Sequence, residues 1–162
     1  MNHGIREKKF VYSGQMATDP FLIAALEQAR KSLAEGGIPI GSVLVHQGNI
    51  IGRGHNCRVQ TGSSIDHGEM NCLRNAGRLS AEIYRQCTIY STLSPCAMCS
   101  GAIVLYKIPR VVVGENKTFM GAEDYLRMNG IQVEVLQDSE CINLMTEFIQ
   151  SNSALWNEDI GV

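Results

Sequence analysis

Apolar residues recur with a helical period near the start of the chain. After Pro20 they follow the three-to-four-residue spacing that places side chains on one helical face. Asp19 suits the N-cap of this helix and Pro20 its first turn, and Gly36-Gly37 would end it. The residues of this stripe are Phe21, Leu22, Ala25, Leu26, Ala29 and Leu33. The pattern predicts an amphipathic helix that packs on a core and carries no chemistry of its own.

Short apolar runs bounded by turn residues predict the strands. Residues 42–46 and 50–54 flank Gln47-Gly48-Asn49, whose composition is typical of a β-hairpin turn. Further β-branched or alternating runs predict strands over residues 86–92, 110–114 and 131–136. The run at 110–114 is apolar almost throughout, which is typical of a strand covered on both faces.

Helical segments separate the later strands, beginning near His67, Cys96, Gly121 and Asp138. Strands alternating with helices after an initial hairpin indicate an α/β fold. We therefore expect a three-layer α/β/α sandwich with a central mixed sheet of about five strands. Residues 1–19 are interpreted as an N-terminal arm and residues 20–162 as one domain. Within it we expect a polar loop over residues 57–66 and a C-terminal tail over residues 151–162.

Composition limits the expected partners and the expected compartment of the protein. The chain has 162 residues, a net charge of −2 and no basic block, so we expect no nucleic-acid partner. No apolar run is long enough to span a bilayer, and no membrane partner is expected. Six cysteines without a signal-peptide pattern indicate free thiols in a reducing compartment, and we expect a cytoplasmic protein.

The candidate chemistry lies in two short motifs. Cys96 and Cys99 stand three residues apart at a predicted helix start after Pro95, so both sulfurs can reach one ion. The N–H groups of a helix N-terminus favour their thiolate forms. His67 and Glu69 open another predicted helix. Three protein ligands leave one tetrahedral position open, which is typical of a catalytic zinc rather than a structural one.

The combination H-x-E with P-C-x-x-C is the signature of the zinc nucleobase deaminases. Zinc lowers the pKa of bound water and supplies hydroxide at neutral pH, and Glu69 can move the proton. The expected reaction is hydrolytic loss of ammonia from an amidine-like carbon. The two thiols could instead form a structural zinc site or a redox pair. A closed zinc site needs a fourth ligand, and the four other cysteines, Cys57, Cys72, Cys87 and Cys141, form no second C-x-x-C.

Beyond these motifs, the chain resembles the fungal-type cytosine deaminases of the cytidine and deoxycytidylate deaminase superfamily. The resemblance runs from about residue 36 to the C-terminus. Its segments are residues 36–41, Gly52-Arg53-Gly54-His55-Asn56, His67-Gly68-Glu69, residues 93–99, Ile108-Pro109-Arg110, residues 113–116, and Trp156-Asn157-Glu158-Asp159-Ile160-Gly161. It implies a homodimer that deaminates free cytosine to uracil in pyrimidine salvage, with one zinc ion per chain.

The resemblance also implies a role for individual residues. His67, Cys96 and Cys99 would bind zinc, and Glu69 would be the proton shuttle. Asn56 would hydrogen-bond the pyrimidine edge, Asp159 would contact the substrate, and Phe119 and Trp156 would form aromatic pocket walls. From the position of the tail after the last predicted helix, we add the hypothesis that Trp156 and Asp159 form a lid that excludes a ribose. The full set of implied substrate-binding residues is Asn56, Asp159, Gly68, Ser94, Phe119, Trp156 and Ile40.

Several substrates remain open at this point. The chain departs from the family pattern at Asp66, Met70-Asn71 and Ala97, so guanine, creatinine or a triazine ring are alternatives to cytosine. Adenosine in transfer RNA is another, which the neutral charge balance disfavours. A catalytically idle zinc module is a fourth alternative, and the intact Glu69 argues against it.

Overall fold

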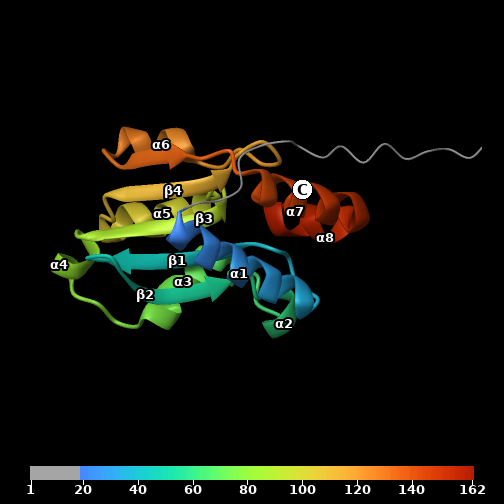
Figure 1. Cartoon of the computed structure of the whole chain (residues 1–162), viewed down its shortest axis with the longest axis horizontal. Helices are drawn as coiled ribbons and strands as arrows, with labels where there is room; N and C mark the ends of the chain where they lie inside the picture. Colours follow the sequence, from blue (N-terminus) through green and yellow to red (C-terminus); the bar gives the residue numbers. More distant parts are fainter. Residues whose placement is uncertain (1–18) are drawn as a thin grey trace, which may run out of the picture.

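A mixed sheet of five strands runs through the molecule in the order β2-β1-β3-β4-β5 (Figure 1). The computed structural model describes residues 19–162, so the predicted N-terminal arm lies outside the described residues except for Asp19. β1 pairs antiparallel with β2 and β3, whereas β3, β4 and β5 are parallel. The strands are β1 Gly41–His46, β2 Asn49–His55, β3 Cys87–Leu93, β4 Arg110–Glu115 and β5 Gln132–Val135. The predicted mixed sheet is confirmed.

The hairpin between β1 and β2 turns where the sequence predicted. Gln47 and Gly48 have φ angles of 49° and 77°, as a two-residue turn that follows the twist of the strands requires. Farther along β2, Gly54 lets α3 (Gly68–Ala76) approach closely, because a Cβ there would lie 2.1 Å from the Cys72 nitrogen. The hairpin is thereby fixed against the helix that begins at His67.

Helices cover both faces of the sheet. α1 (Pro20–Ala34) and α7 (Ser139–Ser151) pack on one face, and α3 and α5 (Ala97–Tyr106) on the other. Side chains alternate accordingly, so that Ile89 of β3 faces α3 and α5 while its neighbour Tyr90 faces α1. α6 (Glu123–Met128) lies beside β5. The predicted three-layer sandwich is confirmed.

α1 begins as predicted, but one member of its stripe is not in the core. Asp19 caps the helix by accepting a hydrogen bond from the Phe21 nitrogen at 2.9 Å. The prediction for Leu33 was wrong, since this side chain is 44% exposed. Its neighbour Ser32 is fully buried and donates a hydrogen bond to the Asn56 carbonyl at 2.6 Å, which turns Ser32 inward at the last turn.

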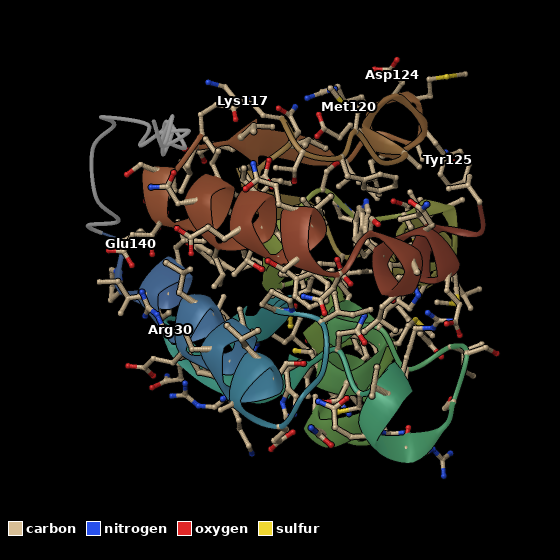
Figure 2. The ribbon with its side chains drawn as sticks, turned by 90° about the vertical axis from the view of Figure 1, so that its right-hand side faces the viewer. Arg30, Lys117, Met120, Asp124, Tyr125 and Glu140 are labelled. Carbon is tan, nitrogen blue, oxygen red and sulfur yellow. The ribbon has the colours of Figure 1, made fainter. Side chains whose placement is uncertain are left out.

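Three segments contain helix that the sequence pattern did not predict. The expected loop over residues 57–66 contains α2 (Arg58–Thr61), and α4 (Ala81–Tyr84) precedes β3. The expected tail over residues 151–162 contains α8 (Ser153–Ile160). α7 and α8 lie together at one end of the molecule, and this end faces the viewer in Figure 2, where Arg30 of α1 and Glu140 of α7 form an ion pair.

Two expectations drawn from composition can be checked against the fold. All six cysteines carry free thiols, as predicted. Across residues 19–162, no helix combines the length and the apolar character needed to cross a membrane.

Candidate active site

The site forms where two helices begin beside the central strands. His67 is the N-cap residue of α3, and Cys96 is the N-cap residue of α5, which follows β3 directly. Neither side chain caps its own helix. Both N-cap side chains therefore remain available to bind a ligand placed between the two helix starts.

The structure brings the three predicted zinc ligands together. One ligand atom each from His67, Cys96 and Cys99 lies within 4.8 Å of the other two, and His67 Nδ1 is 3.6 Å from Cys96 Sγ. Tetrahedral zinc with ordinary Zn–N and Zn–S bonds would hold nitrogen and sulfur about 3.5 Å apart. One imidazole and two thiolates are also donors that zinc prefers. The residues therefore fit a zinc ion.

The surroundings of Cys96 favour its thiolate form. The pKa of Cys96 is lowered to about 4, mainly by the hydrogen bond from Cys99 and also by His67, against the opposing effect of burial. The same hydrogen bond, together with burial, raises the pKa of Cys99 well above its usual value. Burial lowers the pKa of His67, but Cys96 and Asp159 outweigh it and the pKa rises. A thiolate is thus present before a cation adds its own charge.

Glu69 lies beside the ligands in the first turn of α3, where the sequence placed it. Its side chain is buried, and Ser91 Oγ of β3 donates a hydrogen bond to its Oε1 at 2.8 Å. Burial raises the pKa of Glu69, mainly because the carboxylate is withdrawn from water. Ser91 was missed, since a serine within a strand gives no signal of its own in the sequence.

A small pocket opens onto this cluster, and it encloses about 260 Å³ of space, part of which is open to solvent. Five of the predicted substrate-binding residues line it, and Leu93 and Ile160 are two lining residues that were missed. The lining residues are Ile40, His67, Glu69, Leu93, Ser94, Cys96, Phe119, Trp156, Asp159 and Ile160.

The outer wall of the pocket is aromatic. Phe119 and Trp156 meet edge to face, with ring centroids 5.7 Å apart. Phe119 lies on the loop between β4 and α6, which two buried glutamates hold. Glu115 accepts hydrogen bonds from the backbone nitrogens of residues 117 and 118, and Glu123 accepts one from Ser94 Oγ at 2.8 Å. The Ser94 hydroxyl is thus bonded to the loop and its backbone nitrogen donates to the Glu115 carbonyl at 3.0 Å, so its carbonyl oxygen is the part left for a ligand.

Two predicted substrate-binding residues lie behind the pocket rather than on its wall. Asn56 is fully buried and donates to Asp159 Oδ1 at 2.9 Å, while its own Oδ1 accepts from the Arg58 nitrogen. Gly68 packs under Ile40, where a Cβ would lie 3.2 Å from the Ile40 carbonyl oxygen. Asp159 does line the pocket, with Oδ1 3.7 Å from His67 Nε2. A carboxylate in this position orients a metal-binding imidazole.

Comparisons with known proteins agree with this geometry. The family model for the cytidine and deoxycytidylate deaminase zinc-binding region matches residues 17–115. The chain is 55% identical to the cytosine deaminase of Candida albicans over 141 residues, which cover 86% of this chain and 94% of that protein. It is 40% identical to a tRNA-specific adenosine deaminase of Streptococcus pyogenes over 141 residues, or 80% of this chain and 88% of that protein.

Among solved structures, the fold is similar to that of a mutant protein crystallised in complex with 8-azaguanine. The TM-score is 0.71 with 24% sequence identity, and the match covers 85% of this chain and 86% of that one. At this identity the likeness shows the fold alone.

Proposed function

The chain belongs to the cytidine and deoxycytidylate deaminase family of zinc enzymes, and from that premise we propose that it deaminates free cytosine to uracil and ammonia. The observation that carries the choice of a free base is the position of α8. Trp156, Asp159 and Ile160 of this helix line the pocket beside His67 and Cys96, and we propose that they close over one small ring. The 55% identity to the Candida albicans cytosine deaminase supports the same substrate.

In this proposal, Glu69 moves the protons of the reaction. A zinc ion held by His67, Cys96 and Cys99 would lower the pKa of water and so make hydroxide available near neutral pH. Glu69 accepts one proton from water and passes it to the ring nitrogen next to the reacting carbon as the water oxygen bonds to that carbon. Glu69 then takes the proton of the added hydroxyl and delivers it to the amino group, which leaves as ammonia when the C–N bond breaks. Water and cytosine thus give uracil and ammonia. Burial raises the pKa of Glu69, which favours its proton-carrying form between these transfers, and Ser91 fixes its direction.

The side of the pocket that Phe119 and α8 form would orient the base. Phe119 and Trp156 enclose the ring, and Asp159 accepts a hydrogen bond from its amino group while Oδ1 stays beside His67. Asn56 acts through Asp159, because its amide is already hydrogen-bonded to that carboxylate. In this proposal Asn56 therefore orients Asp159, whereas the family resemblance implied that Asn56 itself contacts the pyrimidine edge.

The substrate is tested by ammonia release from the zinc-loaded enzyme. We expect rapid release from cytosine and little from guanine, creatinine or a transfer-RNA anticodon stem-loop, with none after zinc is removed by a chelator. The identity to transfer-RNA deaminases makes the stem-loop the strictest competitor. Release from the stem-loop or from guanine at a rate above that from cytosine would overturn the proposal.

We also propose a homodimer that buries one side of α5. This helix is apolar nearly all round, yet Leu105 is 70% exposed and Tyr106 is 42% exposed. Tyr106 also lines a groove together with Leu73, Leu79 and Tyr84, and the side chains of Arg74 and Arg78 border it. A second copy would cover this surface and the outer side of the helix that carries Cys99. Light scattering should give the mass of a dimer for the parent protein. Leu105→Glu should dissociate this dimer, whereas Ile65→Glu, at another exposed position, should not. A monomeric parent protein would contradict the proposed homodimer.

The setting of the reaction is part of the proposal. Free thiols at all six cysteines suit a reducing compartment, so we place the activity in the cytoplasm, where deamination of a free base would serve pyrimidine salvage.

A further inference from the structure

We propose that Arg58 is a positioning residue that holds α8, and with it Asp159, over the pocket. Arg58 lies in α2, outside every motif that carries the family resemblance. α2 and α8 lie at the same end of the molecule (Figures 1 and 2). The effect on substrate rests on the proposed function, whereas the effect on α8 does not.

The guanidinium of Arg58 contacts both acidic residues near the end of α8. Its Nη1 is 3.4 Å from Asp159 Oδ1, and its Nη2 is 3.6 Å from Glu158 Oε1. The third nitrogen, Nε, donates a hydrogen bond to the Ser64 carbonyl at 3.2 Å, which fixes the plane of the guanidinium group. The Arg58 side chain is only 11% exposed, so its charge is largely withdrawn from water and depends on these acceptors.

Arg58 can affect the pocket through the carboxylate of Asp159. Asn56 Nδ2 at 2.9 Å, Arg58 Nη1 at 3.4 Å and His67 Nε2 at 3.7 Å all approach the same oxygen, Oδ1. The other oxygen of Asp159 is thereby left for a ligand. Since Asp159 itself lines the pocket, turning its carboxylate would change both the contact with the base and the contact with His67.

α8 is anchored by Trp156, which packs in a hydrophobic cluster with Ile40, Met145 and Phe148. Its C-terminal end, which carries Glu158 and Asp159, depends on the Arg58 contacts. The helix has eight residues, its N-cap Asn152 makes no side-chain hydrogen bond to the helix, and only Trp156 and Asp159 are buried. A helix this short is not stable alone. Trp156 packs on Phe119 on one side, and the Arg58 contacts hold the acidic residues on the other. Loss of Arg58 should therefore loosen the C-terminal end of α8, while His67, Cys96 and Cys99 keep their places at the starts of α3 and α5.

The first experiment needs no substrate. Trp156 is the only tryptophan in the chain, so its emission reports how α8 is docked. In the zinc-loaded protein, Arg58→Met should shift the emission to longer wavelength and increase quenching by iodide, and Arg58→Lys should do so less. Arg110→Met is the matched control, since it removes another arginine ion pair, with Glu134, between β4 and β5. Unchanged emission in Arg58→Met, or an equal shift in the control, would overturn the proposal.

The second experiment measures catalysis and zinc. Arg58→Met should raise KM for cytosine about tenfold while zinc stays at one ion per chain and kcat changes less, as for residues that orient a ligand. If Arg58 acts through Asp159, adding Arg58→Met to Asp159→Asn should raise KM no further. Fully multiplicative effects, or loss of zinc, would contradict the proposed route. If the parent protein did not act on cytosine, the proposed function would fail while the emission of Trp156 would still decide the role of Arg58.

Discussion

Two sides of one pocket are built in different ways. The metal side comes from the starts of α3 and α5, which pack on the same face of the sheet, and His67, Cys96 and Cys99 all lie within a stretch of 33 residues. The cover side comes from the loop that carries Phe119 and from α8, which lie later in the chain. Its parts meet through the hydrophobic cluster around Trp156, which includes the contact with Phe119, and through a few polar contacts.

This difference separates chemistry from substrate choice. Side chains at helix starts packed on a sheet have little freedom, which suits zinc ligands and a proton carrier whose positions cannot vary. A short helix held by few contacts can open for a substrate and close over it. We expect changes on the metal side to remove zinc or turnover, and changes on the cover side to alter affinity and selection.

The largest effect is expected from the thiol ligands. Cys96→Ala and Cys99→Ala should each lose zinc and reduce turnover to background, and the melting temperature should fall because metal binding is coupled to folding. Elemental analysis and thermal unfolding measure both effects. Cys87→Ala is the control, since Cys87 is a buried cysteine outside the site. One zinc per chain in both ligand variants would show that the ligands were misassigned.

Glu69→Gln should separate metal binding from proton transfer within the metal side. The amide keeps the shape of the side chain but cannot accept the proton, so we expect one zinc per chain and a kcat at least roughly 100-fold lower. Glu134→Gln on β5 is the control and should keep normal turnover. Near-normal turnover in Glu69→Gln would mean that another group carries the proton.

Removing the cover should leave the metal side intact. A chain that ends at residue 152 lacks α8, and we expect it to retain zinc while kcat/KM for cytosine falls by roughly 100-fold, because the base is no longer oriented. Trp156→Ala provides a milder version in which the rest of α8 is kept. Loss of zinc in both variants would break the proposed separation of the two sides, as would full activity in the shortened chain.

A smaller effect is expected at the aromatic wall. Phe119→Leu removes the edge-to-face contact with Trp156, a contact worth about 0.5–1.5 kcal/mol, so KM should rise roughly 3- to 10-fold with little change in kcat. Its neighbour Met120 lies on the outer rim in Figure 2 and is 61% exposed, which makes Met120→Ala a matched control. An equal change in the two variants would argue against a specific role for Phe119.

The metal side could be predicted from the sequence because its geometry is local. Once a helix begins after Pro95, the positions of Cys96 and Cys99 relative to each other are fixed within one turn. The same holds for His67 and Glu69 at the start of α3. The order of strands and helices then brings the two helix starts together, which the alternating pattern also indicated.

The cover side could not be predicted in the same way, because its contacts depend on where distant segments dock. Residues 151–162 were expected as a tail, since the start at Asn152 has no side-chain cap and only two buried residues mark the helix. The partners of Asn56 and Arg58 depend on the position of α8, about 100 residues later. Ser91 likewise reaches Glu69 only through the packing of β3 against α3.

The most direct test of a free base as the substrate compares kcat/KM for cytosine and cytidine on one zinc-loaded preparation. Trp156 and Asp159 lie on the pocket wall, and in the proposed function they close over a single ring and exclude a ribose. We predict a kcat/KM for cytosine at least roughly 100-fold above that for cytidine. Comparable values for the two substrates would contradict both the assignment to a free base and the role of α8 in substrate selection.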